Sequence, residues 1–391
     1  MTLEIDSSFL QASSEVGPGN FENQYNGIYN KRLEQLSPLI EPLIPQPYCT
    51  INSIIQGKNC SLIGVTYKEL FSRPNILNEY KELTGNPNPQ KLEATEKDKL
   101  YLEDLTDRIE LVDIDPYKYV TGIVIGVFGY IENYVFMVTT VFEPVVEIPK
   151  PFEPCKGKIV FISDLACDSQ NFKDNKVAAK NLGMLMKESS LTVFLGNNFD
   201  ASVKPSSDEL LSFQAKMQVI KSMPIQKLES FISASRAKVL LMPGENDPVS
   251  VRLPQAPYHK VLINSSNIEL CTNPVSFKYE GISFLCGAGE SPKSIQTTSS
   301  LSFHEAQRSL LKWHHYAPTA PDYLPCIPVQ KKDYLVISET PNFFVCGLGD
   351  EHEESELNGC IVISVPSFNQ SLSAVVLDLE TCHSQLVKLN E

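Results

Sequence analysis

Residues 158–166 read KIVFISDLA, residues 191–200 read LTVFLGNNFD, and residues 237–248 read AKVLLMPGENDP. Each stretch is a short, continuous apolar run that leads into Gly, Asp or Asn. Amphipathic stretches over 175–189 and 207–234 separate the runs and are typical of helices. Apolar strands that alternate with helices predict a buried sheet covered by helices, in a mixed α/β fold.

Further apolar runs of strand type follow toward the C-terminus. They are ISFLCGAG (282–289), DYLVIS (333–338), FFVCGLGD (343–350) and CIVISVPSF (360–368). Ahead of the first strand, EIPKPFEPCKG (147–157) has the Pro, Lys and Gly content of a linker, which indicates a domain boundary near residue 150. The sequence therefore predicts one α/β domain over 151–391.

The part of the chain before this boundary divides in two. Apolar residues at spacings of three and four predict a helix over 21–43, which the Pro-rich stretch PLIPQP (42–47) ends. Strand-like runs such as CSLIGVTYKEL (60–70) and RIELVDID (108–115) follow. We therefore expect a helical segment over 1–46 and a β domain over 47–150.

One hairpin of this β domain is clear in the sequence. It joins YVTGIVIGVFGYI (119–131) to NYVFMVTTVF (133–142) across a polar break at Glu132-Asn133. Short twisted strands with glycines that relieve curvature suit a small closed barrel of the OB-fold type. A plain β-meander is the open alternative.

Composition excludes some functions. The 391 residues carry 33 Lys and Arg against 47 Asp and Glu, a net charge of −14, so tight DNA binding by bulk charge is excluded. Ten cysteines show no Cys-x-x-Cys pair, which leaves a zinc ribbon unsupported and favours buried thiols in a reducing compartment. No membrane span is expected, because Glu132-Asn133 interrupts the most apolar window, 119–142.

Polar residues just past the strand ends are the natural candidates for a site. Their order resembles the pattern of calcineurin-like metallophosphoesterases, which is D-x-H, then G-D-x-x-D, G-N-H-D/E and G-H-x-H. In that family these residues hold two metal ions, which activate a water and clamp the phosphate oxygens. The resemblance implies a β-sandwich flanked by helices for residues 151–391.

The metal ligands of this pattern are largely replaced. Asp164 keeps its place, but Ala166 stands where the pattern has His and Asn197 where it has the bridging Asp. Because affinity for metal depends on ligand number and charge, the resemblance implies no catalytic residue, no metal and no cofactor. The degenerate positions are Asp164, Ala166, Asn197, Asp200, Glu245, Asn246, Leu348 and Asp350.

The surviving carboxylates Asp164, Asp200 and Asp247 lie beside predicted turns, where we expect them to cap backbone N–H groups. The separate histidine of the family has no secure counterpart, and Cys286 and His315 are the nearby candidates. The sequence has no G-x-S-x-G, no P-loop and no G-x-G-x-x-G after a strand, which removes those nucleophile and phosphate sites.

Several segments are similar to the B subunits of the replicative DNA polymerases, and most of all to the small (second) subunits of DNA polymerase delta. The match runs from about Phe21 to the C-terminus. In this family an OB barrel precedes a disabled phosphoesterase domain. The segments are QYNGIYNKRLEQL (24–36), KYVTGIVIGVFG (118–129), MPGENDPVSVRLPQAPYH (242–259), TNPVSF (272–277), HHYAPTAPDYLPCIP (314–328) and FFVCG (343–347).

This resemblance implies a nuclear, non-catalytic scaffold subunit that serves DNA replication and repair. The implied partners are the cysteine-rich C-terminal domain of the polymerase catalytic subunit and the third subunit, with the sliding clamp and DNA reached only indirectly and no membrane. Aromatic and Arg residues carry most of the energy of such interfaces, although burial in the core is their competing interpretation. The partner-binding candidates are Tyr25, Tyr29, Arg32, Trp313, Tyr316 and Tyr323.

Two other functions stay open at this point. A metal-dependent phosphodiesterase or nuclease would rest on Asp164, Asp200 and Asp247. A single-strand binder would use aromatic residues of the barrel, although few Lys or Arg accompany them. These aromatics are Tyr117, Tyr119, Tyr130, Tyr134 and Phe136.

Overall fold

The computed structural model describes residues 2–15, 26–73, 93–200, 225–233, 235, 237–329 and 331–390. The chain forms two compact units, each assembled from separate stretches of sequence. Unit 1 comprises Met1–Ser14, Ile148–Glu290 and Pro341–Glu391, and unit 2 comprises Glu15–Glu147 and Ser291–Thr340. The domain division into 1–46, 47–150 and 151–391 stays a prediction.

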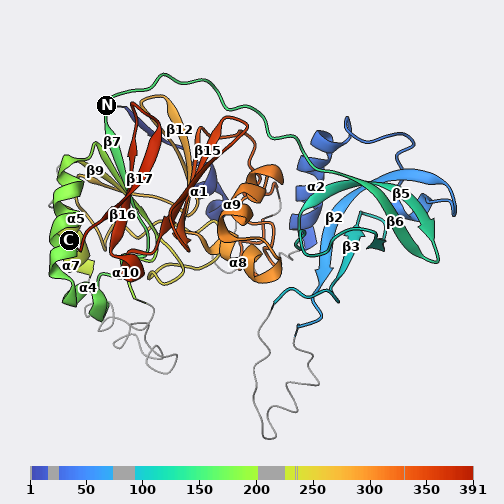
Figure 1. The fold of residues 1–391 in the computed structure, drawn as a ribbon, viewed down its shortest axis with the longest axis horizontal. Coiled ribbons are helices and arrows are strands. Elements are labelled where there is room, and N and C mark those ends of the chain that lie inside the picture. Colours follow the sequence, from blue (N-terminus) through green and yellow to red (C-terminus); the bar gives the residue numbers. More distant parts are fainter. Residues whose placement is uncertain are drawn as a thin grey trace, which may run out of the picture. The chain divides into compact units, whose positions relative to one another are not determined.

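Unit 1 is built on two six-stranded sheets (Figure 1). The first runs β1 (Leu3–Ile5), β11 (Val275–Tyr279), β12 (Ile282–Gly287), β13 (Phe343–Gly349), β15 (Cys360–Pro366), β14 (Glu353–Leu357). The second runs β10 (Ile268–Leu270), β9 (Lys238–Met242), β8 (Leu191–Leu195), β7 (Lys158–Ile162), β16 (Ser373–Asp378), β17 (His383–Lys388). Strands β7 to β10 are parallel, as expected for strands joined through helices.

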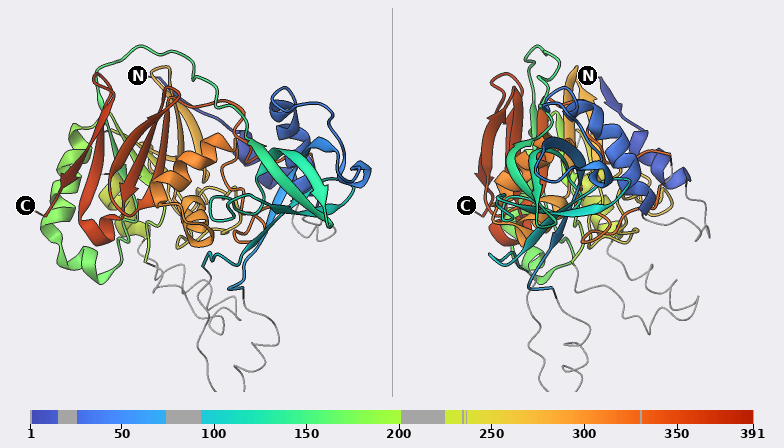
Figure 2. Two further views of the ribbon diagram at one scale, coloured as in Figure 1. Left: turned by 45° about the vertical axis from the view of Figure 1, so that its right-hand side comes forward. Right: turned by 90° about the vertical axis from the view of Figure 1, so that its right-hand side faces the viewer.

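Strand β7 shows why these strands are largely apolar. Ile159 and Phe161 belong to the core between the two sheets, whereas Val160 and Ile162 belong to the core beneath the helices. Alternate residues face opposite sides of a strand, so a strand that is covered on both faces is apolar at most positions. Helices α5 and α7 lie along the outer face of this sheet in Figure 1 and in the left view of Figure 2. The helices of unit 1 are α1 (Ser8–Glu15), α4 (Gln170–Asp174), α5 (Lys176–Glu188), α7 (Ile225–Ser233) and α10 (Phe368–Ser371).

One run that the sequence predicts as a strand is not a strand, and some strands of the structure were not predicted. The run DYLVIS (333–338) is not a strand but a turn with one isolated bridge between Val336 and His315. Its apolar side chains are buried at Leu335 and Ile337 without a neighbouring strand ladder, so the prediction of a strand there is wrong. Conversely, the three-residue strand β1 pairs antiparallel with β11, which the sequence did not indicate.

Unit 2 contains a closed five-stranded barrel. Its order is β2 (Asn59–Glu69), β3 (Lys99–Glu103), β4 (Arg108–Val112), β6 (Val135–Phe142) and β5 (Val124–Glu132). The pair β4 and β6 is parallel, and the other neighbouring pairs are antiparallel. A closed five-stranded barrel in this order is the OB-fold, so that prediction is confirmed and the meander is wrong. The hairpin around Glu132-Asn133 is confirmed as β5 and β6.

Helix α2 (Asn26–Ile40) packs on the barrel of unit 2. Leu36 and Ile40 form one apolar cluster with Val65 and Val124 of strands β2 and β5. A Cβ on Gly126 would lie 2.7 Å from Cγ2 of Ile40, so glycine lets the helix approach β5 closely. The start of the helix expected from residue 21 lies outside the described residues. Unit 2 also has η1 (Ile51–Ser53), α8 (Glu290–Thr298, from Ser291 on) and α9 (Phe303–Lys312).

None of the helices in the described ranges combines the length and the hydropathy that crossing a membrane requires.

Candidate functional site

The loops that follow β7 and β8 in unit 1 are joined by backbone hydrogen bonds. The Asp164 N–H donates to the carbonyl of Gly196 at 3.1 Å, and the Ala166 N–H donates to that of Asn197 at 3.2 Å. The first two degenerate motifs therefore lie side by side, as the parallel pairing of their strands requires.

The loop after β9 and the last residues of strand β13 join the same place. The Asn246 N–H donates to Oδ1 of Asn197 at 3.0 Å. The Leu348 N–H donates to Oγ of Ser163 at 2.8 Å, and Ser163 precedes Asp164. The structure thus brings Asp164, Asn197, Asn246 and Leu348 together at one end of the sandwich, whereas the Glu245 and Asp350 side chains are exposed.

Four of the degenerate positions have a left-handed backbone. The φ angles are 52° at Asp164, 43° at Ala166, 52° at Asn197 and 58° at Leu348. Residues other than glycine rarely adopt this region, and each such residue costs about 1–3 kcal/mol. Strained backbone of this kind is frequent at functional sites, which makes these strand ends the candidate site.

Asp247 connects two of the loops as a buried acceptor. Its Oδ2 accepts from the Gly244 N–H at 2.7 Å, and its Oδ1 accepts from the Phe199 N–H at 3.1 Å. Burial raises the pKa of Asp247 to about 6, although these hydrogen bonds oppose the rise. The prediction that Asp247 caps backbone N–H groups is confirmed.

The other two surviving carboxylates have different surroundings. Oδ2 of Asp164 accepts from the Ser367 hydroxyl at 2.6 Å. The Asp200 N–H donates to Oδ1 of Asp168 at 2.7 Å, so here the capping carboxylate is Asp168. The sequence did not single out Asp168, because an Asp within a turn has no motif of its own.

The residues at the strand ends do not fit a two-metal centre. The side chains of Ala166 and Leu348 have no atom that could coordinate a metal ion. Oδ1 of Asn197 already accepts a hydrogen bond from a backbone N–H. In the described ranges, no group of three or more His, Cys, Asp or Glu is placed to hold a metal ion. Cys286 lies in the apolar core between the sheets, and His315 belongs to unit 2.

A buried amide pair supports the loop after β9. Gln255 and Asn273 form an isolated bridge, and Nδ2 of Asn273 donates to Oε1 of Gln255 at 2.6 Å. Nδ2 of Asn273 also donates to Glu290 at 2.8 Å, while Nε2 of Gln255 donates to the Gly244 carbonyl at 3.3 Å. Satisfied buried polar groups of this kind fix one arrangement of the chain.

In unit 2, Arg32 of α2 is fully buried and all three of its guanidinium nitrogens donate hydrogen bonds. Nε donates to Oδ2 of Asp333 at 2.9 Å. Nη1 donates to the carbonyls of Gly122 and Pro318, each at 2.7 Å, and Nη2 donates to the carbonyl of Ala320 at 3.0 Å. The planar guanidinium thereby joins the helix, the barrel and the segment that follows α9.

His315 completes this buried cluster. Its Nε2 lies 2.8 Å from Oδ2 of Asp333, and its Nδ1 accepts from the Ala317 N–H at 3.1 Å. Burial, together with the positive charge of Arg32, lowers the pKa of His315 to about 4. Burial alone would raise the pKa of Asp333, but His315 and Arg32 hold it well below its usual range. At neutral pH the cluster is therefore an Arg32–Asp333 ion pair with a neutral His315 that donates from Nε2.

Two family models match the chain. The model described as DNA polymerase delta subunit OB-fold domain matches residues 24–141. The model that describes the B subunit of DNA polymerase alpha/epsilon matches residues 159–355, just over half of the chain. The chain belongs to the DNA polymerase alpha/epsilon B-subunit family.

Curated relatives of this B-subunit chain carry the names of delta subunits. The DNA polymerase delta small subunit of Arabidopsis thaliana is 30% identical over 92% of this chain and 90% of the relative. That of Oryza sativa subsp. japonica is 28% identical over 91% and 90%. The DNA polymerase delta subunit 2 of Drosophila melanogaster is 26% identical over 100% and 99%. Among solved structures, a novel archaeal phosphodiesterase aligns with a TM-score of 0.31 and 12% identity over 59% of this chain and 98% of that chain.

Three of the six segments that resemble the B-subunit family meet at Arg32. QYNGIYNKRLEQL supplies Arg32 itself, KYVTGIVIGVFG supplies the Gly122 carbonyl, and HHYAPTAPDYLPCIP supplies the carbonyls of Pro318 and Ala320. Gly122 has φ +89°, and a Cβ there would lie 2.0 Å from the Pro318 oxygen. Glycine is therefore required for both the backbone conformation and the close approach.

The partner-binding candidates of this B-subunit chain differ in exposure. Arg32, Trp313 and Tyr316 are at most 2% exposed in the chain, and Nε1 of Trp313 donates to Glu143 at 3.2 Å. Tyr29 and Tyr323 are only partly buried, and the Tyr29 hydroxyl donates to Asp322. Tyr25 lies outside the described residues. Partner binding by these six residues stays a prediction.

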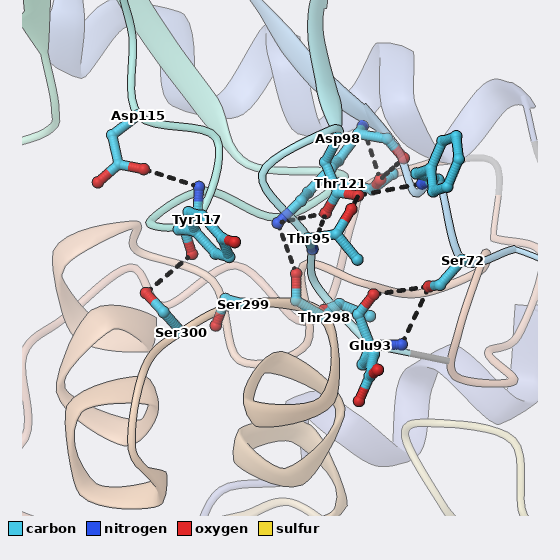
Figure 3. A network of polar contacts seen from close by, with 12 residues as sticks. Ser72, Glu93, Thr95, Asp98, Asp115, Tyr117, Thr121, Thr298, Ser299 and Ser300 are labelled. Carbon is cyan, nitrogen blue, oxygen red and sulfur yellow. Dashed lines mark hydrogen bonds and ion pairs between the residues drawn. The ribbon is translucent and has the colours of Figure 1, made fainter. Parts of the chain in front are cut away.

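Lys68 is a second buried cation of unit 2, and its partners Asp98 and Thr298 are labelled in Figure 3. Its Nζ donates to the Thr298 carbonyl at 2.7 Å and lies 3.5 Å from Oδ2 of Asp98. Burial lowers the pKa of Lys68, although Asp98 opposes the shift. Thr298 ends α8, where the helix dipole favours a positive charge. Lys68 thereby fastens strand β2 to the end of that helix.

Proposed function

We propose that this protein is the small, non-catalytic subunit of a nuclear DNA polymerase delta complex that acts in replication and repair. The observation that carries the proposal is its similarity to a delta small subunit over 92% of this chain and 90% of the relative. The strand ends support a non-catalytic role, because two-metal hydrolysis needs ligands that Ala166 and Leu348 do not supply.

In this proposal the chain holds the cysteine-rich C-terminal domain of the catalytic subunit and also binds the third subunit. The clusters at Arg32 and Lys68 support a scaffold role, because each fixes the barrel to helical segments of unit 2 by buried, charge-assisted hydrogen bonds. Interfaces of permanent complexes bury about 2,000 Å² or more, with aromatic anchors near the centre. Among the five candidates that the structure describes, Tyr29 and Tyr323 keep exposed surface for such contacts.

Co-expression with the polymerase catalytic subunit tests this function. We expect the two chains to co-purify, and deletion of the cysteine-rich C-terminal domain of the catalytic subunit to abolish co-purification. Tyr29→Ala and Tyr323→Ala should weaken the complex. Tyr134→Ala is the matched control, because Tyr134 is 94% exposed at the turn between β5 and β6. Failure of the unaltered chains to co-purify contradicts the proposal.

A hydrolysis assay tests the non-catalytic part separately. We expect the purified chain with added manganese to leave a generic phosphodiester intact. Hydrolysis that Asp164→Ala abolishes would establish the phosphodiesterase alternative instead. Salt-sensitive binding of an oligonucleotide by the isolated chain would favour the single-strand binder, whose residue Phe136 is fully buried in the structure.

A further inference from the structure

The two ends of the barrel in unit 2 have different surroundings. At one end, Lys68 near the end of β2 donates from Nζ to the Thr298 carbonyl of α8 at 2.7 Å. Strand β2 runs from Asn59 to Glu69, so at about 3.3 Å per residue its other end lies up to about 33 Å away along the strand. The hairpin of β5 and β6 turns at this second end and extends away from α8 and α9 in Figure 1.

Three loops meet at this second end of the barrel. The Ile51 N–H donates to Oδ2 of Asp104 at 2.7 Å, which joins the loop before β2 to the turn between β3 and β4. The Gly57 N–H donates to the Ile131 carbonyl at 3.4 Å, which joins the same loop to the end of β5. We call these three loops the hairpin end, and it consists of residues 51–59, 103–108 and 131–135.

Each loop of the hairpin end exposes one large apolar side chain. Ile55 is 58% exposed, Leu105 is 73% exposed and Tyr134 is 94% exposed. Leu105 and Tyr134 are the most exposed large apolar side chains in the described part of unit 2. Large apolar side chains that are exposed together mark an interaction site.

Tyr134 also occupies a backbone position that favours glycine. It is the second residue of the two-residue turn between Glu132 and Val135, and its φ angle is +66°. A bulky residue in this region is a backbone outlier, and hairpin turns of this kind prefer glycine there. Because the side chain is almost fully exposed, packing within the chain does not compensate for the strain. Strained residues of this kind point to a function, here a contact with another molecule.

The carboxylates of the hairpin end outnumber its cations. Two basic residues stand against four acidic ones, which gives a net charge of −2. One of the cations, Arg108, already forms an ion pair with Glu103. Burial would raise the pKa of Asp104, but hydrogen bonds from the Thr106 side chain and from backbone N–H groups lower it, so this carboxylate stays ionised at neutral pH. A partner that complements this surface therefore carries positive charge.

We propose that the hairpin end is a docking surface for a protein segment that carries Lys or Arg beside apolar side chains. Ile55, Leu105 and Tyr134 pack against the apolar side chains of the segment, and the carboxylates around them attract its cations. Nucleic acid fits this surface poorly, because its phosphates would meet carboxylates. The inference goes beyond the proposed function, since Tyr29 and Tyr323 belong to other elements, α2 and the segment after α9.

The test is fluorescence anisotropy of the full-length chain with a fluorescein-labelled amphipathic peptide of Leu and Lys as the probe. We expect the peptide to bind, and the triple variant Ile55→Ser/Leu105→Ser/Tyr134→Ser to raise its Kd about tenfold or more. The matched control is Val145→Ser/Ile148→Ser/Val261→Ser, which replaces three side chains of other segments that are each at least 60% exposed. The control should change the Kd by less than about twofold. Equal weakening by the two triple variants would overturn the proposal.

A second pair of variants separates local charge from the net charge of the chain. Asp107→Asn/Glu132→Gln removes two exposed carboxylates of the hairpin end and should raise the Kd of the Leu/Lys peptide about threefold. Glu188→Gln/Glu380→Gln changes the net charge equally, at two exposed positions of unit 1, and should leave the Kd unchanged. Tighter binding of a Leu/Glu peptide of the same pattern, or of a thymidine oligonucleotide, would refute the choice of partner.

Tyr134→Gly distinguishes a binding role from a structural one. Glycine adopts a positive φ without strain, so the midpoint of urea denaturation should rise. The same variant should weaken binding of the Leu/Lys peptide, because it removes an exposed anchor. A midpoint that falls, or a peptide affinity that stays the same, would contradict the role of Tyr134 in docking.

Discussion

Arg32 donates from Nε to Oδ2 of Asp333 across 2.9 Å, although the two residues are 301 positions apart in the sequence. Both side chains are at most 1% exposed. A buried ion pair is stable only when further hydrogen bonds satisfy its remaining atoms, and here three carbonyls and His315 do so. The two ends of unit 2 in the sequence are therefore held together by one guanidinium.

Replacing Arg32 by Met should lower the free energy of unfolding by about 3–5 kcal/mol, because Asp333 stays buried without its cation. Urea denaturation of the purified chain measures the change. Lys31→Met on the same helix is the control: Lys31 pairs with the exposed Glu34, so a change within about 0.5 kcal/mol is expected. Similar effects of the two variants would contradict the central role of Arg32.

Gly122→Ala should destabilise the chain much more than Gly57→Ala. Both glycines have positive φ angles, +89° and +73°, so both variants incur the backbone strain of about 1 kcal/mol. A Cβ at Gly57 meets nothing within 4 Å, whereas one at Gly122 would lie 2.0 Å from the Pro318 oxygen. We expect an additional loss of about 2 kcal/mol or more at Gly122, measured by urea denaturation. Equal losses of unfolding free energy in the two variants would mean that the segments of Gly122 and Pro318 can move apart without an energetic cost.

His315 should make the chain less stable in mild acid. Its folded pKa of about 4 is below its ordinary value of 6.5, so the unfolded chain binds more protons between these values. Stability is then fully present above pH 6.5 and falls by about 3 kcal/mol as the pH falls to 4. Denaturation curves of the unaltered chain and of His315→Gln, which keeps a donor for Asp333, should converge across this range. A pH-independent difference between them would exclude this titration.

Asp247 should make the chain less stable as the pH rises, which is opposite to the effect of His315. Its folded pKa of about 6 is above its ordinary value of 3.8, so the folded chain binds more protons between these values. This contribution is fully present below pH 3.8 and is lost, by about 3 kcal/mol, as the pH rises through 6. The stability of the unaltered chain relative to Asp247→Asn should therefore fall from pH 4 to pH 6. A relative stability that rises over the same interval would contradict a raised pKa of the buried Asp247 carboxyl.

Local patterns in the sequence were sufficient to predict most of the fold. Strands β7, β8 and β9 lie where continuous apolar runs predicted them, because strands covered on both faces consist mostly of apolar side chains. The strand β1 gave no signal, since three residues are too few to show a period and its partner β11 is far along the chain. The run 333–338 shows the reverse error: its apolar residues are buried, but Asp333 directs the backbone into a turn by accepting from the Leu335 N–H.

The sequence predicted the site residues that belong to a motif, but it did not predict those that lie outside one. Asp164 and Asn197 meet as the order of the motifs indicated, because the parallel strands β7 and β8 fix their positions, and Leu348 of β13 joins them through its hydrogen bond to Ser163. Arg32 was a candidate for partner binding, and the sequence could not show that its acceptors are backbone carbonyls from distant segments. Carbonyl groups are the same in every residue, so no residue type marks them as acceptors.

The left-handed residues at the strand ends bear on how a metal site could be designed in this protein. Asp164, Ala166, Asn197 and Leu348 hold the main chain in a left-handed conformation, although two of these side chains have no atom that could bind a metal ion. An attempt to build a metal site into this sandwich would therefore start by substituting side chains on the existing loops.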